Sequence, residues 1–177
     1  AIGYLRPLAG AIDYLHANDI IHRDLKPANV KVRSDGSPVI LDLGIAKDVS
    51  QANEGMTQTG TAMGTQAYMA PEQLDAKNVD GRADQYAFAL IAYELLGGGL
   101  PWKKGESGAR IVVAKMTGGL EPLHKKGVSQ RVSDSVMKGL SLSPDERFAS
   151  CLDFVDDIEK EQVEKMTDLT LELATEQ

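Results

Sequence analysis

The sequence predicts a mainly helical α+β domain that contains one small β-hairpin. Three observations indicate this fold class. Apolar residues recur at helical spacing over residues 1–18, two short apolar runs flank a turn-forming segment within residues 30–41, and most of the chain after residue 71 has a helical pattern. A chain of 177 residues is long enough to bury one hydrophobic core, so we expect a single domain.

The first expected element is an amphipathic helix over residues 1–18. The apolar residues that recur along it are Ile2, Leu5, Leu8, Ala9, Ile12 and Leu15. Pro7 lies within this range, either near the helix start or at a kink, because proline removes a backbone donor. A hairpin is expected next, since residues 30–32 alternate apolar and polar, residues 39–41 are apolar, and residues 34–37 are turn formers.

Residues 45–69 are polar and lack periodicity, so they predict a long loop, a kind of segment that is usually functional or mobile in compact domains. Four helices are expected after this loop. They cover residues 81–96, 107–117, 129–140 and 148 to the C-terminus. Ser129 and Ser133 are the candidate start residues of the third helix. The charge-rich residues 161–177 are expected to form a solvated helical tail or a linker.

Composition argues against several function classes. The formal net charge is −7, whereas a non-specific nucleic-acid binder is usually basic, so we expect no nucleic-acid partner. Cys151 is the only cysteine and cannot form an internal disulfide, which favours a reducing cytoplasm. The most apolar stretch, residues 86–96, is too short for a membrane segment, which needs about 20 residues. His16 and His124 fit no zinc spacing, and we expect ordinary polar or surface roles for both.

Three motifs occur in order along the chain. They are His22-Arg23-Asp24-Leu25-Lys26-Pro27-Ala28-Asn29, then Asp42-Leu43-Gly44, and then Ala70-Pro71-Glu72. A single Asp or Asn at a loop boundary is most often a turn residue, but the combined pattern is too specific for that interpretation. The motifs resemble the catalytic loop, the metal-binding motif and the end of the activation segment of eukaryotic-type (Hanks-type) protein kinases, and most closely those of bacterial serine/threonine kinases.

The resemblance implies that residues 1–160 form the helical C-terminal lobe of a kinase-like α+β fold, with a catalytic loop at 22–29 and an activation segment at 42–72. No glycine-rich loop, V-A-I-K lysine or αC glutamate precedes His22. We therefore expect the N-terminal lobe to be missing from this chain, either naturally or by truncation. On that interpretation the chain alone is inactive, and its parent protein performs the reaction.

The implied reaction transfers the γ-phosphate of ATP to a Ser or Thr hydroxyl of a protein substrate. By resemblance, Asp24 is the catalytic base, Lys26 lies beside the transferred phosphate, and Thr65 positions these two side chains. Asn29 and Asp42 match the residues that hold Mg²⁺, with Mn²⁺ as an alternative cation. Oxygen donors of this kind suit such hard cations, and phosphate oxygens and waters complete the coordination.

The resemblance also implies regulatory residues. Thr57 and Thr59 are similar to the paired threonines that bacterial receptor-type kinases autophosphorylate. Arg23 and Lys47 occupy the two basic positions that bind such a phosphate, which carries roughly −1.5 to −2 charges.

Structural roles are expected for four further residues, which are His22, Glu72, Asp84 and Arg147. Glu72 and Arg147 match a buried ion pair that ties the activation segment to a late helix. Asp84 matches an aspartate that binds the backbone of the catalytic loop near His22. A helix N-cap is an equally good interpretation of Asp84 from its position alone.

Two alternatives remain open at this stage. The chain could be a pseudokinase-like binding or regulatory module without ATP turnover of its own. It could also be a small-molecule phosphotransferase of the antibiotic-kinase kind, although that kind lacks an A-P-E segment. The expected localisation is the cytoplasm. The protein substrate, the pathway, the oligomeric state and a possible membrane anchor in the parent are not indicated by the sequence.

Overall fold

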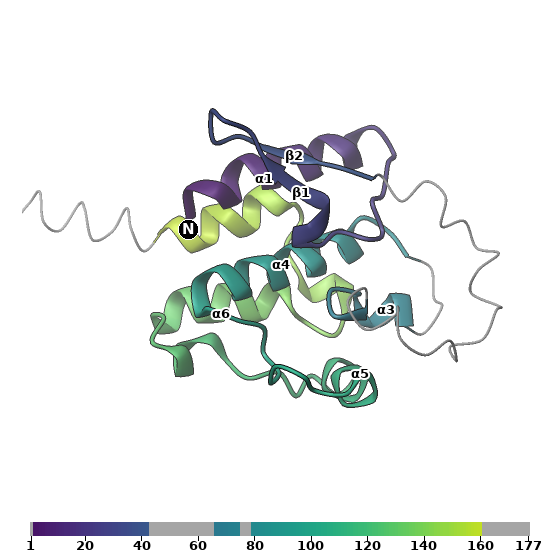
Figure 1. Ribbon diagram of the computed structural model, residues 1–177, viewed down its shortest axis with the longest axis vertical. Coiled ribbons are helices and arrows are strands. Elements are labelled where there is room, and N and C mark those ends of the chain that lie inside the picture. Colours follow the sequence, from purple (N-terminus) through teal and green to yellow (C-terminus); the bar gives the residue numbers. More distant parts are fainter. Residues whose placement is uncertain (1, 43–65, 75–78, 161–177) are drawn as a thin grey trace, which may run out of the picture.

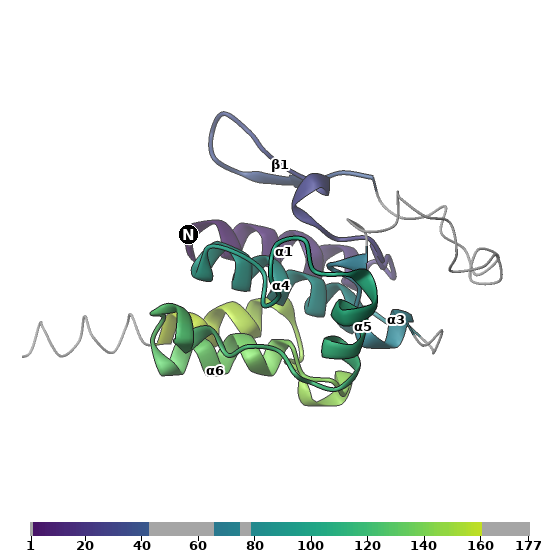
Figure 2. The same cartoon turned by 60° about the horizontal axis from the view of Figure 1, so that its bottom comes forward.

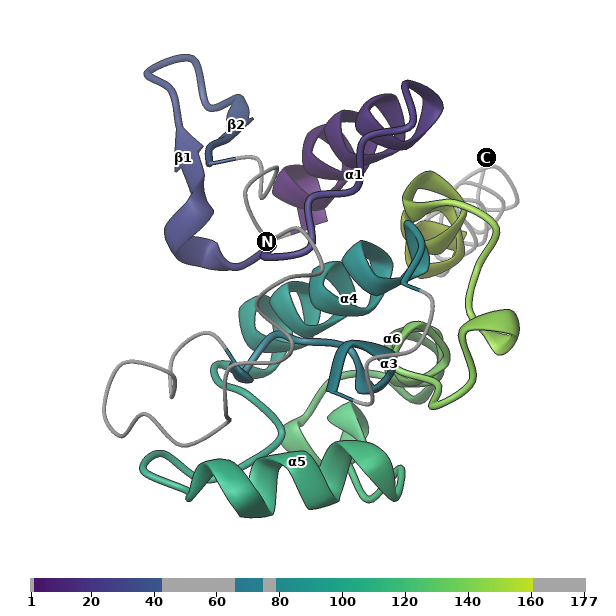
Figure 3. The ribbon, with the colours of Figure 1, turned by 90° about the vertical axis from the view of Figure 1, so that its right-hand side faces the viewer.

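The fold is described from a computed structural model, which describes residues 2–42, 66–74 and 79–160. Helices dominate this part of the chain, and its single sheet has two antiparallel strands, as the sequence predicts. In Figure 3, helix α4 lies in the middle of the molecule, with α1 on one side and α5 on the other. Figure 2 shows the hairpin projecting from the helices.

Helix α1 (Ile2–Ala17) forms where the apolar spacing predicts it. Its buried face consists of Leu5, Leu8, Ala9 and Ile12. Pro7 lies inside the helix, in its second turn, where it removes the N–H donor that would otherwise pair with the carbonyl of Gly3. The helix packs against α4 and β2, and it contacts the last helical segment, residues 151–160, through charged side chains (Figure 1).

The hairpin consists of β1 (Val30–Val32) and β2 (Pro38–Ile40), with Val30 opposite Ile40. The turn between the strands is stabilised by Asp35, whose Oδ1 accepts hydrogen bonds from the Ser37 backbone N–H at 2.8 Å and the Ser37 hydroxyl at 2.6 Å. A short 3₁₀ helix, η1 (Pro27–Asn29), leads into β1. The hairpin reverses the chain, so that the residues after β2 return beside η1.

Helix α4 (Arg82–Gly97) is the central core element, because every residue from 83 to 93 is buried. It ends at Gly98, whose φ of 71° lies in the left-handed region that glycine adopts readily. Helix α6 (Gln130–Gly139) crosses it closely. A Cβ atom at Gly139 would lie 2.9 Å from the Cβ of Ala89, so this crossing requires glycine.

Of the other described elements, α5 is a longer helix and the rest are short. They are α3 (Pro71–Leu74), α5 (Gly108–Met116), η3 (Leu123–Lys126) and η4 (Pro144–Glu146). Of the two predicted start residues of α6, Ser129 is the N-cap, and its hydroxyl accepts from the Val132 N–H. The prediction for Ser133 is wrong. Ser133 lies buried inside α6, where its hydroxyl instead accepts a hydrogen bond from the backbone N–H of His124.

The last helical segment begins at residue 151, not at residue 148 as predicted. Phe148 is not helical because its backbone N–H and C=O both pair with the side-chain amide of Gln85. Asp13 of α1 then accepts hydrogen bonds from the first N–H groups of the segment, those of Cys151 and Leu152, each at 2.9 Å. Contacts from two distant helices therefore determine where this helix starts.

No helix within the described ranges combines the length and the apolar character that a bilayer crossing requires. The predicted tail at 161–177 and most of the predicted loop lie outside the described residues.

Candidate active site

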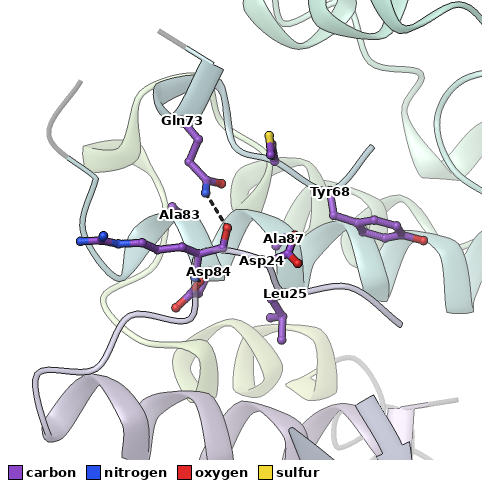
Figure 4. A pocket seen from close by; sticks show the side chains of 9 residues that line it. Asp24, Leu25, Tyr68, Gln73, Ala83, Asp84 and Ala87 are labelled. Atoms are coloured by element: carbon purple, nitrogen blue, oxygen red, sulfur yellow. Dashed lines mark hydrogen bonds between the residues drawn. The ribbon is translucent and has the colours of Figure 1, made fainter. Parts of the chain in front are cut away.

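The catalytic-loop motif lies where α3, α4 and the residues before α3 meet. Figure 4 shows this region, a small pocket lined by the loop residues 23–25, by Tyr68, Met69 and Gln73, and by Ala83, Asp84 and Ala87 of α4. The loop connects α1 to η1, so its two ends are fixed by the helix and by the hairpin.

Asp84 anchors the backbone of this loop. Its carboxylate is 1% exposed and accepts hydrogen bonds from the N–H groups of His22 and Arg23, each at 2.8 Å. The N-cap of α4 is Gly81, so Asp84 is not the cap. Charge-assisted bonds of this kind are roughly twice as strong as neutral ones, and they compensate for burial of the carboxylate.

His16 is the third partner of Asp84, with its Nε2 at 2.9 Å from Oδ2. We expected an ordinary polar or surface role for this histidine. Its role is polar, but the ring is only 23% exposed and lies between α1 and the start of α4, against a buried carboxylate. Gly81 makes room for the ring, since a Cβ atom at that position would lie 2.9 Å from Nδ1 of His16. The sequence holds no local signal for this contact between distant residues.

His22 connects the loop to the hairpin. Its side chain is 1% exposed, its Nδ1 accepts from the Asp24 N–H at 3.3 Å, and its Nε2 lies 3.0 Å from the carbonyl oxygen of Leu41. A ring nitrogen that accepts a hydrogen bond carries no proton, so the arrangement assigns the proton to Nε2, which donates to Leu41. His22 therefore bridges Asp24 and the residue that follows β2.

Arg23 adopts a left-handed backbone conformation, with a φ of 63°. Such a conformation costs about 1–3 kcal/mol for a residue with a side chain and persists where surrounding contacts enforce it. Here the contacts are the bond from its N–H to Asp84 and a second bond, in which Gln73 Nε2 donates to the Arg23 carbonyl at 2.8 Å. The Arg23 guanidinium forms no ion pair with any residue that the structure describes.

Asp24, Lys26 and Asn29 lie together on this loop. The Lys26 ammonium is 2.9 Å from Oδ2 of Asp24, and the two side chains are 20% and 16% exposed. Asn29 is buried, and its Nδ2 donates to the Asp24 carbonyl at 2.8 Å and contacts the Asp24 carboxylate at 3.4 Å. The loop thus presents a carboxylate beside a cation at a position that solvent reaches.

The donor atoms of Asn29 and Asp42 fit a divalent cation. Asn29 uses its Nδ2 toward Asp24, and its Oδ1 accepts no hydrogen bond from the described residues. The Leu41 N–H donates to the Asn29 carbonyl at 2.8 Å, which brings the exposed Asp42 back beside η1. In the described ranges, no group of three or more His, Cys, Asp or Glu side chains is arranged to hold a metal ion by itself. These oxygens fit an open Mg²⁺ site completed by phosphate and water, rather than a closed protein cage.

Glu72 and Arg147 form a buried bidentate ion pair, with N–O distances of 2.7 and 2.8 Å. The Arg147 side chain is 0% exposed and also donates to the carbonyls of Ser141 and Arg82. Its guanidinium lies 4.9 Å from the ring centre of Tyr86. The pair therefore ties α3 to the start of α4 and to the chain after η4.

Lys115 of α5 is a buried cation that sequence reasoning missed. Its ammonium donates to the carbonyls of Gln66, Ala67 and Met69 at 2.6–2.9 Å. It also lies 5.2 Å from the Trp102 ring centre. Burial lowers the pKa of Lys115 from 10.5 to about 7. The available signal was its helical spacing of four residues from the buried Ile111, which places Lys115 on the inward face.

Tyr68 ties the same segment to α4. Its hydroxyl donates a hydrogen bond to the carboxylate of Glu94. Burial, and then this bond, raise the pKa of Tyr68 well above its usual value, so the hydroxyl stays protonated. Residues 66–69 are thus bonded to α4 through Tyr68 and to α5 through Lys115.

Four of the predicted site residues, Lys47, Thr57, Thr59 and Thr65, lie outside the described residues, as does Leu43 of the second motif. Their assigned roles stay predictions.

Comparison with known proteins gives a consistent result. Residues 1–162 match the protein kinase domain family. The chain is 38% identical over 159 residues to serine/threonine-protein kinase PknD of Mycobacterium tuberculosis and 37% identical over 158 residues to serine/threonine-protein kinase Pkn1 of Myxococcus xanthus. Each match covers 86% of this chain but only 23% of the relative, so the chain spans less than a quarter of their length.

A solved structure also matches. The crystal structure of a double mutant of the Mycobacterium tuberculosis PknI kinase domain superposes with a TM-score of 0.65 and 29% sequence identity. The match covers 90% of this chain and 53% of that kinase domain.

The first prediction concerns the buried ion pair. Arg147→Ala should lower the free energy of unfolding by about 3–5 kcal/mol, because it leaves the Glu72 carboxylate buried without its partner. Arg110→Ala is the matched control, since that side chain is 79% exposed and its pair with Glu106 is 3.5 Å long. Its effect should stay within about 0.5 kcal/mol. Urea denaturation measures both, and equal midpoint shifts would contradict the structural role of Arg147.

The second prediction concerns Lys115 and pH. Its pKa is about 7 in the folded chain, against the ordinary 10.5, so the unfolded chain binds an extra proton between these values. The free energy of unfolding should therefore rise with pH across this window, by up to about 1.4 kcal/mol per pH unit. Stability from this group is fully present above pH 10.5 and is lost progressively as pH falls from 10.5 to about 7.

Urea denaturation at several pH values between 7 and 9.5 tests this prediction. Lys115→Met should remove most of the rise, whereas Lys125→Met, at an exposed lysine, should keep it. The same pH dependence in wild type and Lys115→Met would show that the lysine titrates normally.

Proposed function

The chain belongs to the protein kinase family, and we propose that it forms the C-terminal lobe of a bacterial serine/threonine protein kinase. In this proposal, residues 1–160 form the lobe, and residues 161–177 form a helical tail or a linker. The parent protein transfers the γ-phosphate of ATP to Ser or Thr hydroxyls of protein substrates, and a second lobe supplies most contacts to the nucleotide.

The observation that carries this proposal is the arrangement of Asp24, Lys26 and Asn29. A phosphoryl-transfer site needs a group that orients the attacking hydroxyl and cationic groups that neutralise the moving phosphoryl charge. The Asp24 carboxylate can accept the hydroxyl proton. The Lys26 ammonium, 2.9 Å from that carboxylate, provides a positive charge at the same place. Thr65 is proposed to position these two side chains.

Asn29 and Asp42 would hold Mg²⁺ in this site. When bound, Mg²⁺ neutralises the charge of the ATP phosphates and orients them. The protein contributes fixed positions for the oxygen donors. Asn29 is fixed by its bonds to Asp24, and Asp42 follows directly on the bond between Leu41 and Asn29.

Regulation is proposed at Thr57 and Thr59. A phosphate on either residue would bind Arg23 and Lys47. The absence of a described ion-pair partner for the Arg23 guanidinium supports this part of the proposal. Since Arg23 directly precedes Asp24, binding of a phosphate there would act on the catalytic loop itself.

The alternatives receive less support. The presence of Asp24, Asn29 and Asp42 gives no reason to favour a pseudokinase. The match to the protein kinase domain family and the Ala70-Pro71-Glu72 segment argue against a small-molecule phosphotransferase of the antibiotic-kinase kind.

The third prediction tests the proposed chemistry. A fusion of the N-terminal kinase lobe of PknD with this chain should phosphorylate a generic Ser-containing protein when Mg·ATP is added, whereas the chain alone should not. Asp24→Asn should lower the rate by about 10²–10⁴-fold, because it removes the proton acceptor. Asp35→Asn, in the exposed hairpin turn, is the matched control and should leave the rate unchanged.

Circular dichroism shows whether each fusion is folded. A folded fusion that transfers no phosphate, or one that keeps its rate in Asp24→Asn, would contradict the proposed function.

A further inference from the structure

We propose that Gln73 is a positioning residue for phosphate transfer, because its side-chain amide joins the catalytic loop to the segment that leads into α3. By this contact Gln73 fixes the peptide unit that carries Asp24. The consequence for catalysis rests on the proposed function, whereas the contact itself can be tested without any activity.

Gln73 uses both ends of its amide. Its Nε2 donates to the carbonyl of Arg23 at 2.8 Å, and its Oε1 accepts from the N–H of Ala70 at 2.9 Å. The first of these bonds is drawn in Figure 4, where the Gln73 side chain points from α3 toward the loop. The two bonds fix the orientation of the amide, since a flipped amide would face a donor with a donor and an acceptor with an acceptor.

The bonded carbonyl belongs to the peptide unit between Arg23 and Asp24. The N–H of the same unit donates to Nδ1 of His22 at 3.3 Å. The unit is therefore held at both ends, by Gln73 through its C=O and by His22 through its N–H. Because a peptide unit is planar, fixing both ends fixes the Cα position of Asp24 and the direction of its N–Cα bond, so that only the rotation φ remains between this unit and the Asp24 side chain. Arg23 needs such contacts, since its φ of 63° is unfavourable for a residue with a side chain.

A purely local role would explain only half of this geometry. Gln73 is the third residue of α3, and a Gln or Glu at that position commonly accepts from the N–H of the N-cap residue, here Ala70. Glutamate would serve that capping role equally well. Only glutamine also supplies a donor for the Arg23 carbonyl, which lies 50 positions away in the sequence. The choice of Gln over Glu thus distinguishes a loop contact from a cap.

This difference yields a sharp test. Gln73→Glu keeps the acceptor for Ala70 but turns a carboxylate toward the Arg23 carbonyl. The titratable groups that line the same pocket are Asp24 and Arg23 of the loop, Tyr68, and Asp84 of α4. Asp24 is paired with Lys26, and Glu72, the neighbour of Gln73 in α3, is paired with Arg147. The like charges, and the bond that only the protonated acid can donate to Arg23, both raise the pKa of the introduced carboxyl.

The fourth prediction follows from the raised pKa of the introduced carboxyl. In the active fusion at pH 8, Gln73→Glu and Gln73→Leu should each lower the rate, by up to about 100-fold. As pH falls toward 6, the ratio of Gln73→Glu activity to wild-type activity should rise, because the protonated acid restores the bond to Arg23. The Gln73→Leu ratio should stay flat. Gln130→Glu, on the exposed start of α6, is the matched control and should equal wild type at every pH.

Amide hydrogen exchange in the 177-residue chain tests the contact apart from catalysis. The Asp24 amide should exchange faster in both variants, whereas the Ala70 amide should stay protected in Gln73→Glu and lose protection in Gln73→Leu. Unchanged exchange at Asp24 in the folded variants would overturn the inference, as would full Gln73→Glu activity at pH 8. If the wild-type fusion itself transfers no phosphate, the proposed function fails, and the exchange measurement decides the inference.

Discussion

The buried carboxylate of Asp84 is the constraint on which the rest of the site depends. It lies in the first turn of α4, the helix with the longest run of buried residues in the described chain, so its position is fixed by the core. Its three partners, the N–H groups of His22 and Arg23 and the ring of His16, come from the catalytic loop and the end of α1. Leaving a buried donor unpaired costs about 1–3 kcal/mol, so the loop conformation is coupled to this one side chain.

Single hydrogen bonds and one ion pair connect the loop that Asp84 anchors to the neighbouring elements. His22 bonds the loop to the end of β2, which brings Asp42 beside Asn29. Gln73 bonds the loop to α3, and Glu72 of α3 is paired with Arg147. The side chains with proposed chemistry thus stand on a short irregular loop, yet the loop is fixed by hydrogen bonds from elements far away in the sequence. A loop positioned by a rigid scaffold is a common arrangement for catalytic groups.

The sequence predicted the fold class, the hairpin and the helices because their periodicities are local properties of the chain. It also indicated candidate residues for the chemistry, since the motifs are contiguous strings, and the roles of these residues stay predictions. Contacts between distant elements were harder to foresee. The residues near His16 and Gln73 in the sequence give no indication of their hydrogen-bond partners. The last helix begins at residue 151 because Gln85 binds the backbone of Phe148 and Asp13 binds that of Cys151. Lys115 lay on a predicted helix face, but its burial against three carbonyls depends on a segment 46–49 positions away.

Amide hydrogen exchange at His22 and Arg23 tests the central role of Asp84 most directly. Asp84→Asn keeps the size of the side chain but replaces one acceptor oxygen with a donor. The account predicts that both amides are strongly protected in the wild-type chain. In Asp84→Asn, at least one of them should exchange about 10-fold faster or more, while amides in the middle of α4 keep their protection. Unchanged protection of both amides in a folded Asp84→Asn chain would contradict the account.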